Sequence, residues 1–322
     1  MNYKVTRYQP EQKQKWNEFI NRAKNATFLF HRDFMDYHSE RFEDYSLMVF
    51  SEEKLVSVLP ANLIGNEIYS HQGLSYGGFI FSKKSSLQDC ISICQETLKF
   101  LLDNRILKLN LKSIPIIYQN QICQELEVLV FFLEAKLTRV DTYFVIDNSE
   151  KYKPNRNRKR AINKGNSNGI VVKKSIDFDV FWNTLLTPNL QDRFNVKPTH
   201  SLPEIELLYN RFPNNIVFYG AYENNQMKAG AVIFEMNSVA HFQYSSGDEN
   251  RDEGALDLLF DFIIKQYKHK KYVSFGTSSE AHGSKINKGL AYWKESFGAK
   301  SIVQNFYEIQ TSNYKKLTNR FV

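Results

Sequence analysis

Two stretches of this 322-residue chain predict the same order of helices and strands, and this repeat limits the folds available to the chain. In each stretch, hydrophobic periodicity and turn residues predict three consecutive strands, a helix, a strand, a second helix and a closing strand. Corresponding strands begin near residues 46 and 216, 67 and 238, 107 and 272, and 141 and 302, so the separations are 170, 171, 165 and 161 residues. The spacing predicts an α/β protein with two tandem units. The alternative is one large mixed sheet.

The polar segment from Asp147 to Pro154 is the best candidate for a linker, so we expect domains at 1–150 and 151–322. In the first domain the pattern predicts helices at 12–23, 31–41, 86–104 and 119–136, and strands at 45–50, 55–64, 67–71, 107–111 and 142–146. In the second it predicts helices at 156–164, 178–186, 202–211, 252–268 and 286–297, and strands at 170–174, 216–222, 228–235, 238–245, 271–275 and 301–309. A turn is expected at 165–169 and an irregular stretch around Pro188.

The positive charge of the chain is concentrated in one short segment. Residues 151–174 hold nine lysines and arginines and no acidic residue, and the rest of the chain has 33 basic and 35 acidic residues, a net charge of −2. The segment is therefore a candidate docking surface for an acidic ligand: a nucleotide, an aminoacyl-tRNA end or an anionic lipid carrier. A solvated helix face is the alternative. No aromatic residue lies between Lys153 and Lys174, which argues against stacking of single-stranded bases.

Several classes of protein are not expected from this sequence. The three cysteines, Cys90, Cys94 and Cys123, form no C-x-x-C pair and are expected to be reduced and buried. The amino-terminal residues contain no apolar segment typical of a signal peptide, and no apolar run approaches the length of a membrane span, so we expect a soluble cytoplasmic protein. Motifs for metal ligands, a Walker loop and a G-x-S-x-G elbow are missing, so we expect no metal.

The segment FGTSSEAHGSKINKGLAYWKESFGA, residues 275–299, contains the strongest local signal. Glu280 follows a predicted strand, at the edge where α/β folds open into a cleft. A partly desolvated carboxylate there is a candidate to accept a proton from an attacking amine or hydroxyl. The alternative for Glu280 is a solvated loop residue or a helix cap. For Lys294 and Glu295 an exposed helical face is the favoured interpretation.

The segment HFQYSSGDENRDEGALDLLFDFIIKQY, residues 241–267, predicts a strand, a loop and an amphipathic helix. Free N–H groups at the start of that helix offer a site for an anion such as a pyrophosphate, although four acidic residues in the loop oppose it. His241 and Tyr244 are candidate proton-transfer residues on the strand. Because they are three residues apart, strand alternation predicts that they lie on opposite faces.

These patterns resemble known acyltransferases. The element order is similar to the core of the GNAT acyltransferases, and the tandem resembles the Fem-type aminoacyl transferases and their GNAT-like relatives. Residues 275–298 are similar to the block F-G-S-t-E … N-x-G-L-x-x-x-K-E-x-F-G. Arg251 and Gly254 match part of the Q/R-x-x-G-x-G/A signature, but Leu256 stands where a small residue is usual. Residues 71–78 and 158–169 resemble two further family segments, a His-x-Gly-x-x-Tyr-Gly-Gly stretch and a basic helix.

The resemblance implies two GNAT-like domains with mixed, partly splayed sheets flanked by helices. It implies transfer of an acetyl or acyl group from acyl-CoA to an amine, or a hydroxyl, of a sugar or cell-envelope precursor, including a nucleotide-linked one. The alternatives are a Fem-type aminoacyl-tRNA-dependent aminoacyl transferase and a non-catalytic protein that binds a nucleotide sugar or a carrier. The candidate residues are Glu280, Tyr244 and His241 for catalysis; Ser245, Gly247, Arg251, Gly254, Ala255 and Asn287 for the donor; and His71, Tyr76, Arg158 and Lys294 for the acceptor.

Overall fold

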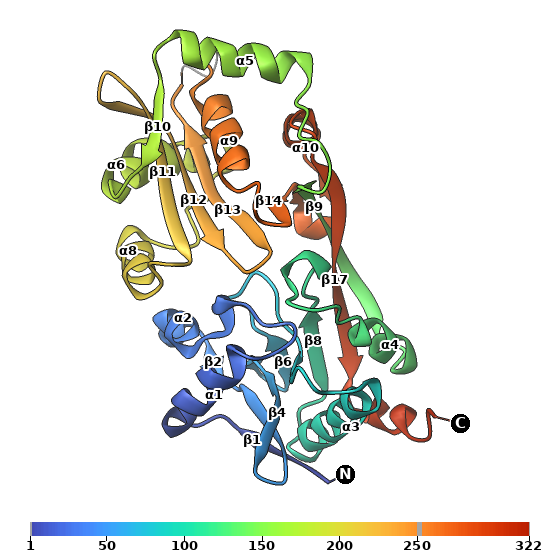
Figure 1. The fold of residues 1–322 in the computed structure, drawn as a ribbon. Coiled ribbons are helices and arrows are strands. Elements are labelled where there is room, and N and C mark those ends of the chain that lie inside the picture. Colours follow the sequence, from blue (N-terminus) through green and yellow to red (C-terminus); the bar gives the residue numbers. More distant parts are fainter. Residues whose placement is uncertain (1, 250–252, 322) are drawn as a thin grey trace. The chain divides into compact units, whose positions relative to one another are not determined.

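The computed structural model describes residues 2–249 and 253–321, and these divide into two compact units (Figure 1). Unit 1 comprises Met1–Asp141, His282–Ser284 and Val303–Val322, and unit 2 comprises Thr142–Ala281 and Lys285–Ile302. The predicted α/β architecture is confirmed, because both units combine helices with sheets that contain parallel and antiparallel strand pairs.

Unit 1 contains two groups of strands. One sheet has the order β1-β3-β4-β7, formed by β1 (Tyr3–Arg7), β3 (Leu47–Ser51), β4 (Lys54–Leu59) and β7 (Ile80–Phe81). The second group has the order β17-β8-β6-β5-β2, formed by β17 (Lys300–Gln310), β8 (Lys108–Lys112), β6 (Glu67–Ser70), β5 (Asn62–Ile64) and β2 (Glu43–Asp44). The helices are α1 (Lys13–Ile20), α2 (Arg32–Met35), α3 (Leu87–Asp103) and α4 (Glu125–Phe132).

The core of unit 1 forms around α3. Its apolar residues recur at helical spacing and face the strands, and the helix begins at a capping box made by Ser86 and Asp89. Cys90, Cys94 and Cys123 are buried in this core, and burial raises the pKa of the Cys90 thiol to about 12. The cysteines are therefore packing residues that remain protonated.

Unit 2 is a sheet with the order β10-β11-β12-β13-β14-β9. Its strands are β10 (Val171–Lys174), β11 (Ile216–Glu223), β12 (Gln226–Glu235), β13 (Val239–Gly247), β14 (Tyr272–Thr277) and β9 (Lys136–Asp147). One face packs against α5 (Arg156–Ser167), α9 (Ala255–Gln266) and α10 (Lys288–Ser296), with Ile162, Phe260 and Phe297 in the shared core. On the other face lie α6 (Phe178–Val180), the π turn Phe181–Leu186, α7 (Thr187–Phe194) and α8 (Leu202–Arg211).

The last strand of each sequence repeat completes the sheet of the other unit. β9 follows α4 of unit 1 in the chain, but its residues Tyr143–Asp147 pair antiparallel with β14 of unit 2. β17 follows α10 of unit 2, but its residues Phe306–Gln310 pair with β8 of unit 1. The predicted positions of the closing strands are close to the observed ones, and their pairing partners are exchanged between the two repeats.

Several predicted elements differ from the structure; the predicted strand 55–64, for example, is divided into β4 and β5, which lie in different strand groups. The irregular stretch around Pro188 includes the helix α7, because proline is tolerated in the first turn of a helix. The predicted turn at 165–169 is found only at residues 168 and 169, since α5 continues to Ser167. A Cβ atom on Gly165 would lie 2.8 Å from the Gly254 oxygen, so this glycine permits close approach of two helices. The predicted helix 119–136 is helical only at Glu125–Phe132.

Membrane-spanning helices and clusters of metal ligands are both missing from the described residues. Within 2–249 and 253–321, every helix is too short or too polar to cross a bilayer. In the same ranges, no group of three or more histidine, cysteine and acidic side chains is placed to hold a metal ion.

Candidate functional site

The strands β13 and β14 pair over only part of their length. Their parallel register joins Val239 to Tyr272, Ala240 to Val273 and His241 to Ser274, and then it stops. β13 continues to Gly247, where it still pairs with Ala229 of β12, and β14 continues to Thr277, which pairs with Tyr143 of β9. We call residues 242–247 and 275–277 the parted edges. As predicted, the two central parallel strands of unit 2 separate.

A bulge in β13 changes which side chains share a face. Phe242 pairs with Ile233 and Tyr244 pairs with Val232, so Gln243 is an extra residue in the ladder. His241 pairs with Phe234, which is two residues from Val232 in β12. Phe234 and Val232 lie on the same face, and therefore His241 and Tyr244 do as well. The prediction that they lie on opposite faces is wrong because strand alternation fails across a bulge.

Lys294 of α10 is buried at the parted edge of β14. Its side chain is 4% exposed, and its Nζ donates hydrogen bonds to the carbonyl oxygens of Gly276 at 3.0 Å and Thr277 at 2.7 Å. No carboxylate pairs with this lysine among the described residues, and burial lowers its pKa to about 7. The predicted exposed position is wrong. A buried amine that is readily deprotonated is a candidate for proton transfer.

His241 lies where the two strands begin to separate. Its Nδ1 is 3.2 Å from the Ser274 hydroxyl, and a Cβ atom on Gly276 would lie 3.4 Å from its ring. Burial, with a smaller contribution from the charge of Lys294, lowers the pKa of His241 to about 3. The imidazole is therefore neutral at physiological pH, and it does not compete with Lys294 for a proton.

Tyr244 belongs to a partly buried polar group that the sequence pattern did not indicate. Its hydroxyl lies 2.6 Å from Nδ1 of His200 and accepts a hydrogen bond from the His200 backbone N–H at 3.1 Å. The Trp182 ring packs at 5.1 Å, and burial raises the pKa of Tyr244 to about 12. His200 is 4% exposed and follows Pro198 in a stretch without clear periodicity, so sequence reasoning missed it.

The far end of β13 is held by α7. The side-chain amide of Asn189 donates to the Ser246 hydroxyl at 2.8 Å and to the Gly247 oxygen at 2.7 Å. Ser245 is exposed on the same parted edge. These bonds fix the end of β13 to the helical layer, so the separation from β14 is built into the fold.

The start of α9 is closely covered by α5. Gly254 caps α9 with a φ of +82°, and a Cβ atom there would lie 2.1 Å from the Ala161 oxygen. Ala255, the first residue of α9, is buried in the core. Gly254 and Ala255 therefore serve helix packing, and their role in donor binding stays a prediction. The predicted donor residue Arg251 lies outside the described residues.

Arg158 is held in an ion pair that connects three helices. Its guanidinium pairs with Asp257 of α9 and lies over the Phe297 ring at 5.5 Å. The indole N–H of Trp293 donates to the same carboxylate at 3.2 Å. Both charged side chains are largely buried, with 15% and 10% of their surfaces exposed. The structure gives Arg158 a packing role, and acceptor binding by this residue stays a prediction.

Glu280 and Asn287 are joined by a hydrogen bond. Glu280 ends β15 (Ser279–Glu280), which pairs with β16 (Lys285–Ile286), and its Oε1 accepts from the Asn287 amide at 2.7 Å. The Oδ1 of Asn287 accepts from the Leu290 N–H at 2.9 Å and caps α10. Glu280 is exposed, so the expected desolvation is not found. Its catalytic role stays a prediction.

His71 and Tyr76, the predicted acceptor residues of unit 1, are both buried. Burial lowers the pKa of His71 to about 3, and the Tyr76 hydroxyl donates to the Thr27 hydroxyl at 3.1 Å. The chain after β6 folds back to the end of β8, with the Gly77 N–H bonded to the Lys112 oxygen at 3.0 Å. A Cβ atom on Gly77 would lie 1.7 Å from the Ser70 oxygen, so this loop fills its space closely.

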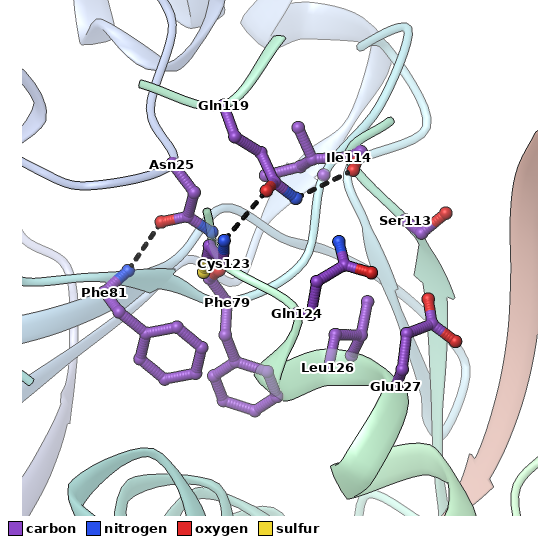
Figure 2. A pocket seen from close by; sticks show the side chains of 11 residues that line it. Asn25, Phe79, Phe81, Ser113, Ile114, Gln119, Cys123, Gln124, Leu126 and Glu127 are labelled. Carbon is purple, nitrogen blue, oxygen red and sulfur yellow. Dashed lines mark hydrogen bonds between the residues drawn. The ribbon is translucent and has the colours of Figure 1, made fainter. Parts of the chain in front are cut away.

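Unit 1 also contains a small, partly open pocket (Figure 2). Its lining residues come from the segments around Asn25, 77–81, 113–119 and 123–127. Apolar and polar side chains both contribute to the lining, and Figure 2 shows Gln124 and Glu127 beside Leu126. No pattern in the sequence indicated this pocket, because its walls are distant in the chain.

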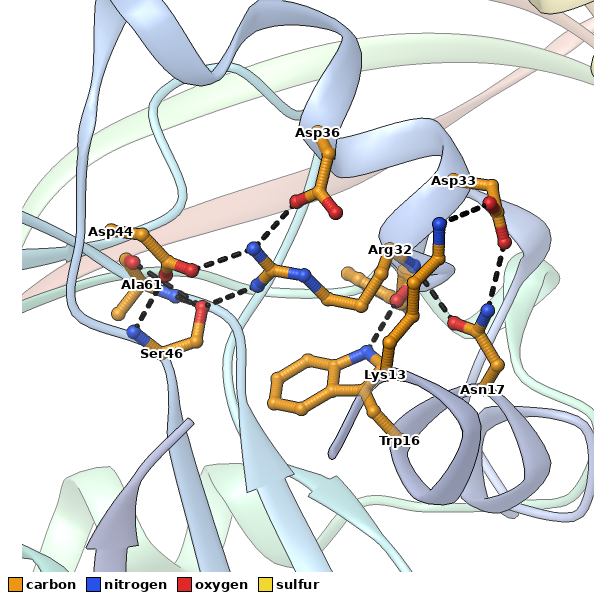
Figure 3. Close-up of polar contacts among 10 residues, drawn as sticks. Lys13, Trp16, Asn17, Arg32, Asp33, Asp36, Asp44, Ser46 and Ala61 are labelled. Atoms are coloured by element: carbon orange, nitrogen blue, oxygen red, sulfur yellow. Dashed lines mark hydrogen bonds and ion pairs between the residues drawn. The ribbon is translucent and has the colours of Figure 1, made fainter. Parts of the chain in front are cut away.

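A buried arginine organises the amino-terminal part of unit 1 (Figure 3). Arg32 is 5% exposed and pairs with Asp36 and Asp44, each at 2.6 Å. Its guanidinium lies over the Tyr8 ring at 4.1 Å, and the nearby Trp16 indole donates to the Phe30 oxygen at 2.7 Å. Because Arg32 of α2 pairs with both carboxylates, and Asp44 belongs to β2, this cluster joins α2 to β2 and has a structural role.

Comparison with solved structures shows the same fold over nearly the whole chain. FemX superposes with a TM-score of 0.67 at 8% identity, covering 98% of this chain and 99% of that chain. L-PGS from Bacillus licheniformis gives 0.60 at 11%, covering 96% and 94%. A tandem GNAT protein from the clavulanic acid biosynthesis pathway gives 0.52 at 9%, covering 96% and 99%.

The chain therefore has the tandem GNAT-like, FemAB-like fold that the sequence resemblance predicted. The sequence matches no protein-family model and no curated protein. At these low identities the structural likeness establishes the fold, and the activity has to be argued from the site.

Proposed function

We propose that this chain is an acyltransferase that binds an activated acyl donor along the parted edges of β13 and β14. The observation that carries the proposal is the position of Lys294, a buried lysine with a near-neutral pKa bonded to the end of β14. The fold shared with FemX, L-PGS and a tandem GNAT protein supports the same class. In this proposal residues 151–322 hold the donor and residues 1–150 hold the acceptor.

The reaction follows from the chemistry of a neutral amine at this place. Two hydrogens of the Lys294 amine donate to backbone carbonyls, so its lone pair is available to accept a proton. An acceptor amine attacks the acyl carbonyl carbon and forms the new C–N bond while Lys294 takes its proton. Backbone N–H groups of the parted edge stabilise the oxyanion. The bond to the donor sulfur or oxygen then breaks, and Lys294 returns the proton to the leaving group.

Acyl-CoA is the donor that we propose first, with an amine of a sugar or cell-envelope precursor as acceptor. A second donor class, aminoacyl-tRNA, is favoured by the outer face of α5. Arg156, Lys159, Arg160 and Lys164 are exposed there, and within the described ranges none of them forms an ion pair. Exposed lysine and arginine side chains along one helix can form ion pairs with the phosphates of a nucleic acid.

Donor binding gives a direct test of the proposal. A ligand present at about 100 times its Kd adds about 2.7 kcal/mol to stability, so acetyl-CoA or an aminoacyl-tRNA should raise the melting temperature by several degrees. Arg160→Gln with Lys164→Gln should weaken stabilisation by tRNA and leave stabilisation by CoA unchanged. Lys83→Gln with Lys84→Gln, an equal charge change on an exposed loop, is the control. If neither acetyl-CoA nor an aminoacyl-tRNA raises the melting temperature, the proposal is wrong.

Glu280 is the alternative proton acceptor, and Glu280→Gln decides between it and Lys294. We expect turnover of Glu280→Gln to stay within about fivefold of wild type, because an exposed carboxylate has little effect on a buried proton transfer and glutamine still accepts from Asn287. Steady-state kinetics and thermal melting measure the effect. A loss of more than about a hundredfold in a stably folded variant assigns the role to Glu280.

A further inference from the structure

Two aromatic side chains protrude from one part of the surface of unit 1. Phe131, in the last turn of α4, is 78% exposed, although Leu129 of the same helix is buried in the core. Phe321 is 51% exposed. The two places are connected, because the Phe131 ring lies 6.0 Å from the Phe132 ring and the Arg320 guanidinium lies over Phe132 at 4.7 Å. Exposed aromatic rings that gather in this way often mark an interaction site.

The segment 311–321 is packed against the helices of unit 1, beside the end of α4 (Figure 1). The Asn313 amide donates to the Leu133 oxygen at 2.8 Å. The Gln95 amide of α3 donates to the Thr318 hydroxyl at 2.9 Å. These bonds fix the segment in place, so its charged side chains form part of the same surface as the exposed rings.

This segment carries positive charge. Residues 311–321 include Lys315, Lys316 and Arg320 and no acidic residue. Lys316 pairs with Glu134. Lys315 and Arg320 are exposed, and within the described ranges neither of them forms an ion pair. The surface therefore combines protruding aromatic rings with two cations that no carboxylate neutralises.

We propose that the surface formed by Phe131, Phe321, Lys315 and Arg320 docks on a bilayer that contains anionic lipids. The rings enter the boundary between headgroups and acyl chains, where their apolar area leaves water. The cations are attracted to the lipid phosphates. A bilayer can satisfy both kinds of side chain at once, because its apolar and anionic groups lie within a few ångströms of each other. This docking does not depend on acyl transfer.

Sedimentation of the full chain with vesicles tests the apolar part of the proposal. Vesicles of phosphatidylcholine with about 30% phosphatidylglycerol should bind at least about tenfold more tightly than phosphatidylcholine alone, and salt should weaken the binding. Phe131→Ser should lower the affinity about tenfold, because the buried area of the ring is lost. Ile122→Ser changes another highly exposed apolar side chain, with no lysine or arginine within five residues, and should leave the affinity unchanged.

A pair of charge variants tests the electrostatic part. Lys315→Gln with Arg320→Gln should lower the affinity for the anionic vesicles by about tenfold or more. Arg160→Gln with Lys164→Gln makes an equal charge change on the basic helix α5 and is the matched control. If the α5 pair lowers the affinity as much as the first pair does, net charge or α5 carries the binding and the proposal is wrong.

Phe131→Trp reports whether this position enters the bilayer. Brominated lipid quenches indoles that lie in the bilayer, so the fluorescence of Phe131→Trp should fall more than that of wild type, whose three tryptophans supply the background. Ile122→Trp should show no additional quenching. The proposal is overturned if residue 131 is not quenched, if only residue 122 is quenched, or if the chain binds neither kind of vesicle.

Discussion

Replacing Lys294 with methionine should lower turnover by at least about a hundredfold and raise the stability of the folded chain. A positioned general base contributes roughly 10²- to 10⁴-fold to a rate, and methionine has a similar length but accepts no proton. The rate of wild type should rise with pH through about 7 and then level off, because the reaction needs the neutral amine. Kinetics across pH 6–9 measure both effects.

The gain in stability follows from the direction in which burial moves the pKa. The pKa of Lys294 is about 7 in the folded chain and 10.5 when solvated, so the unfolded chain binds the extra proton between these values and burial of the lysine opposes folding. Lowering a pKa by one corresponds to about 1.4 kcal/mol, and the two lost hydrogen bonds offset about 1 kcal/mol each. We expect a net gain of about 1–3 kcal/mol at pH 7, which becomes smaller as pH rises toward 10.5.

Denaturant unfolding at pH 7 and pH 9.5 measures this difference. Lys288→Met removes an exposed lysine at the start of the same helix and is the control for loss of charge. A Lys294→Met protein that is inactive and less stable than wild type would indicate a structural lysine. One that keeps its turnover would remove Lys294 from the reaction.

The order of elements was predictable because apolar residues repeat with the helix or strand period along each segment. Three features were not, since they depend on distant parts of the chain. β9 pairs with β14 and β17 pairs with β8, so the exchange of these two strands depends on residues that are far apart in the chain. The bulge at Gln243 appears only in the register between two strands. The pocket of unit 1 joins four separate segments.

The burial of Lys294, in contrast, has a signal in the sequence that the exposed-face interpretation overlooks. Lys294 lies three residues before Phe297, and residues three apart share one face of a helix. Phe297 is fully buried, so its face of α10 is the inward one. A lysine on the inward face of an amphipathic helix is uncommon, and such positions often mark functional sites.

Asp257→Ala should destabilise unit 2 by about 3–5 kcal/mol. The substitution leaves the largely buried Arg158 guanidinium and the Trp293 N–H without their acceptor, and an uncompensated buried charge is costly. The Nε atom of Arg158 already lacks a hydrogen-bond partner in the described part of the chain. Denaturant unfolding of the full chain measures the loss. Lys13→Met, which breaks the partly exposed ion pair with Asp33, should cost no more than about 1 kcal/mol.

The double variant Arg158→Met with Asp257→Leu separates packing from acceptor binding. Burial raises the pKa of Asp257 even though Arg158 opposes the shift, so the pair only partly offsets the cost of removing both charges from water. Apolar side chains of similar size should therefore recover most of the lost stability. If Arg158 only joins α5 to α9 and α10, the double variant also keeps its KM for the acceptor. Recovered stability with a KM raised about tenfold or more would instead assign Arg158 to the acceptor site, as the sequence resemblance implies.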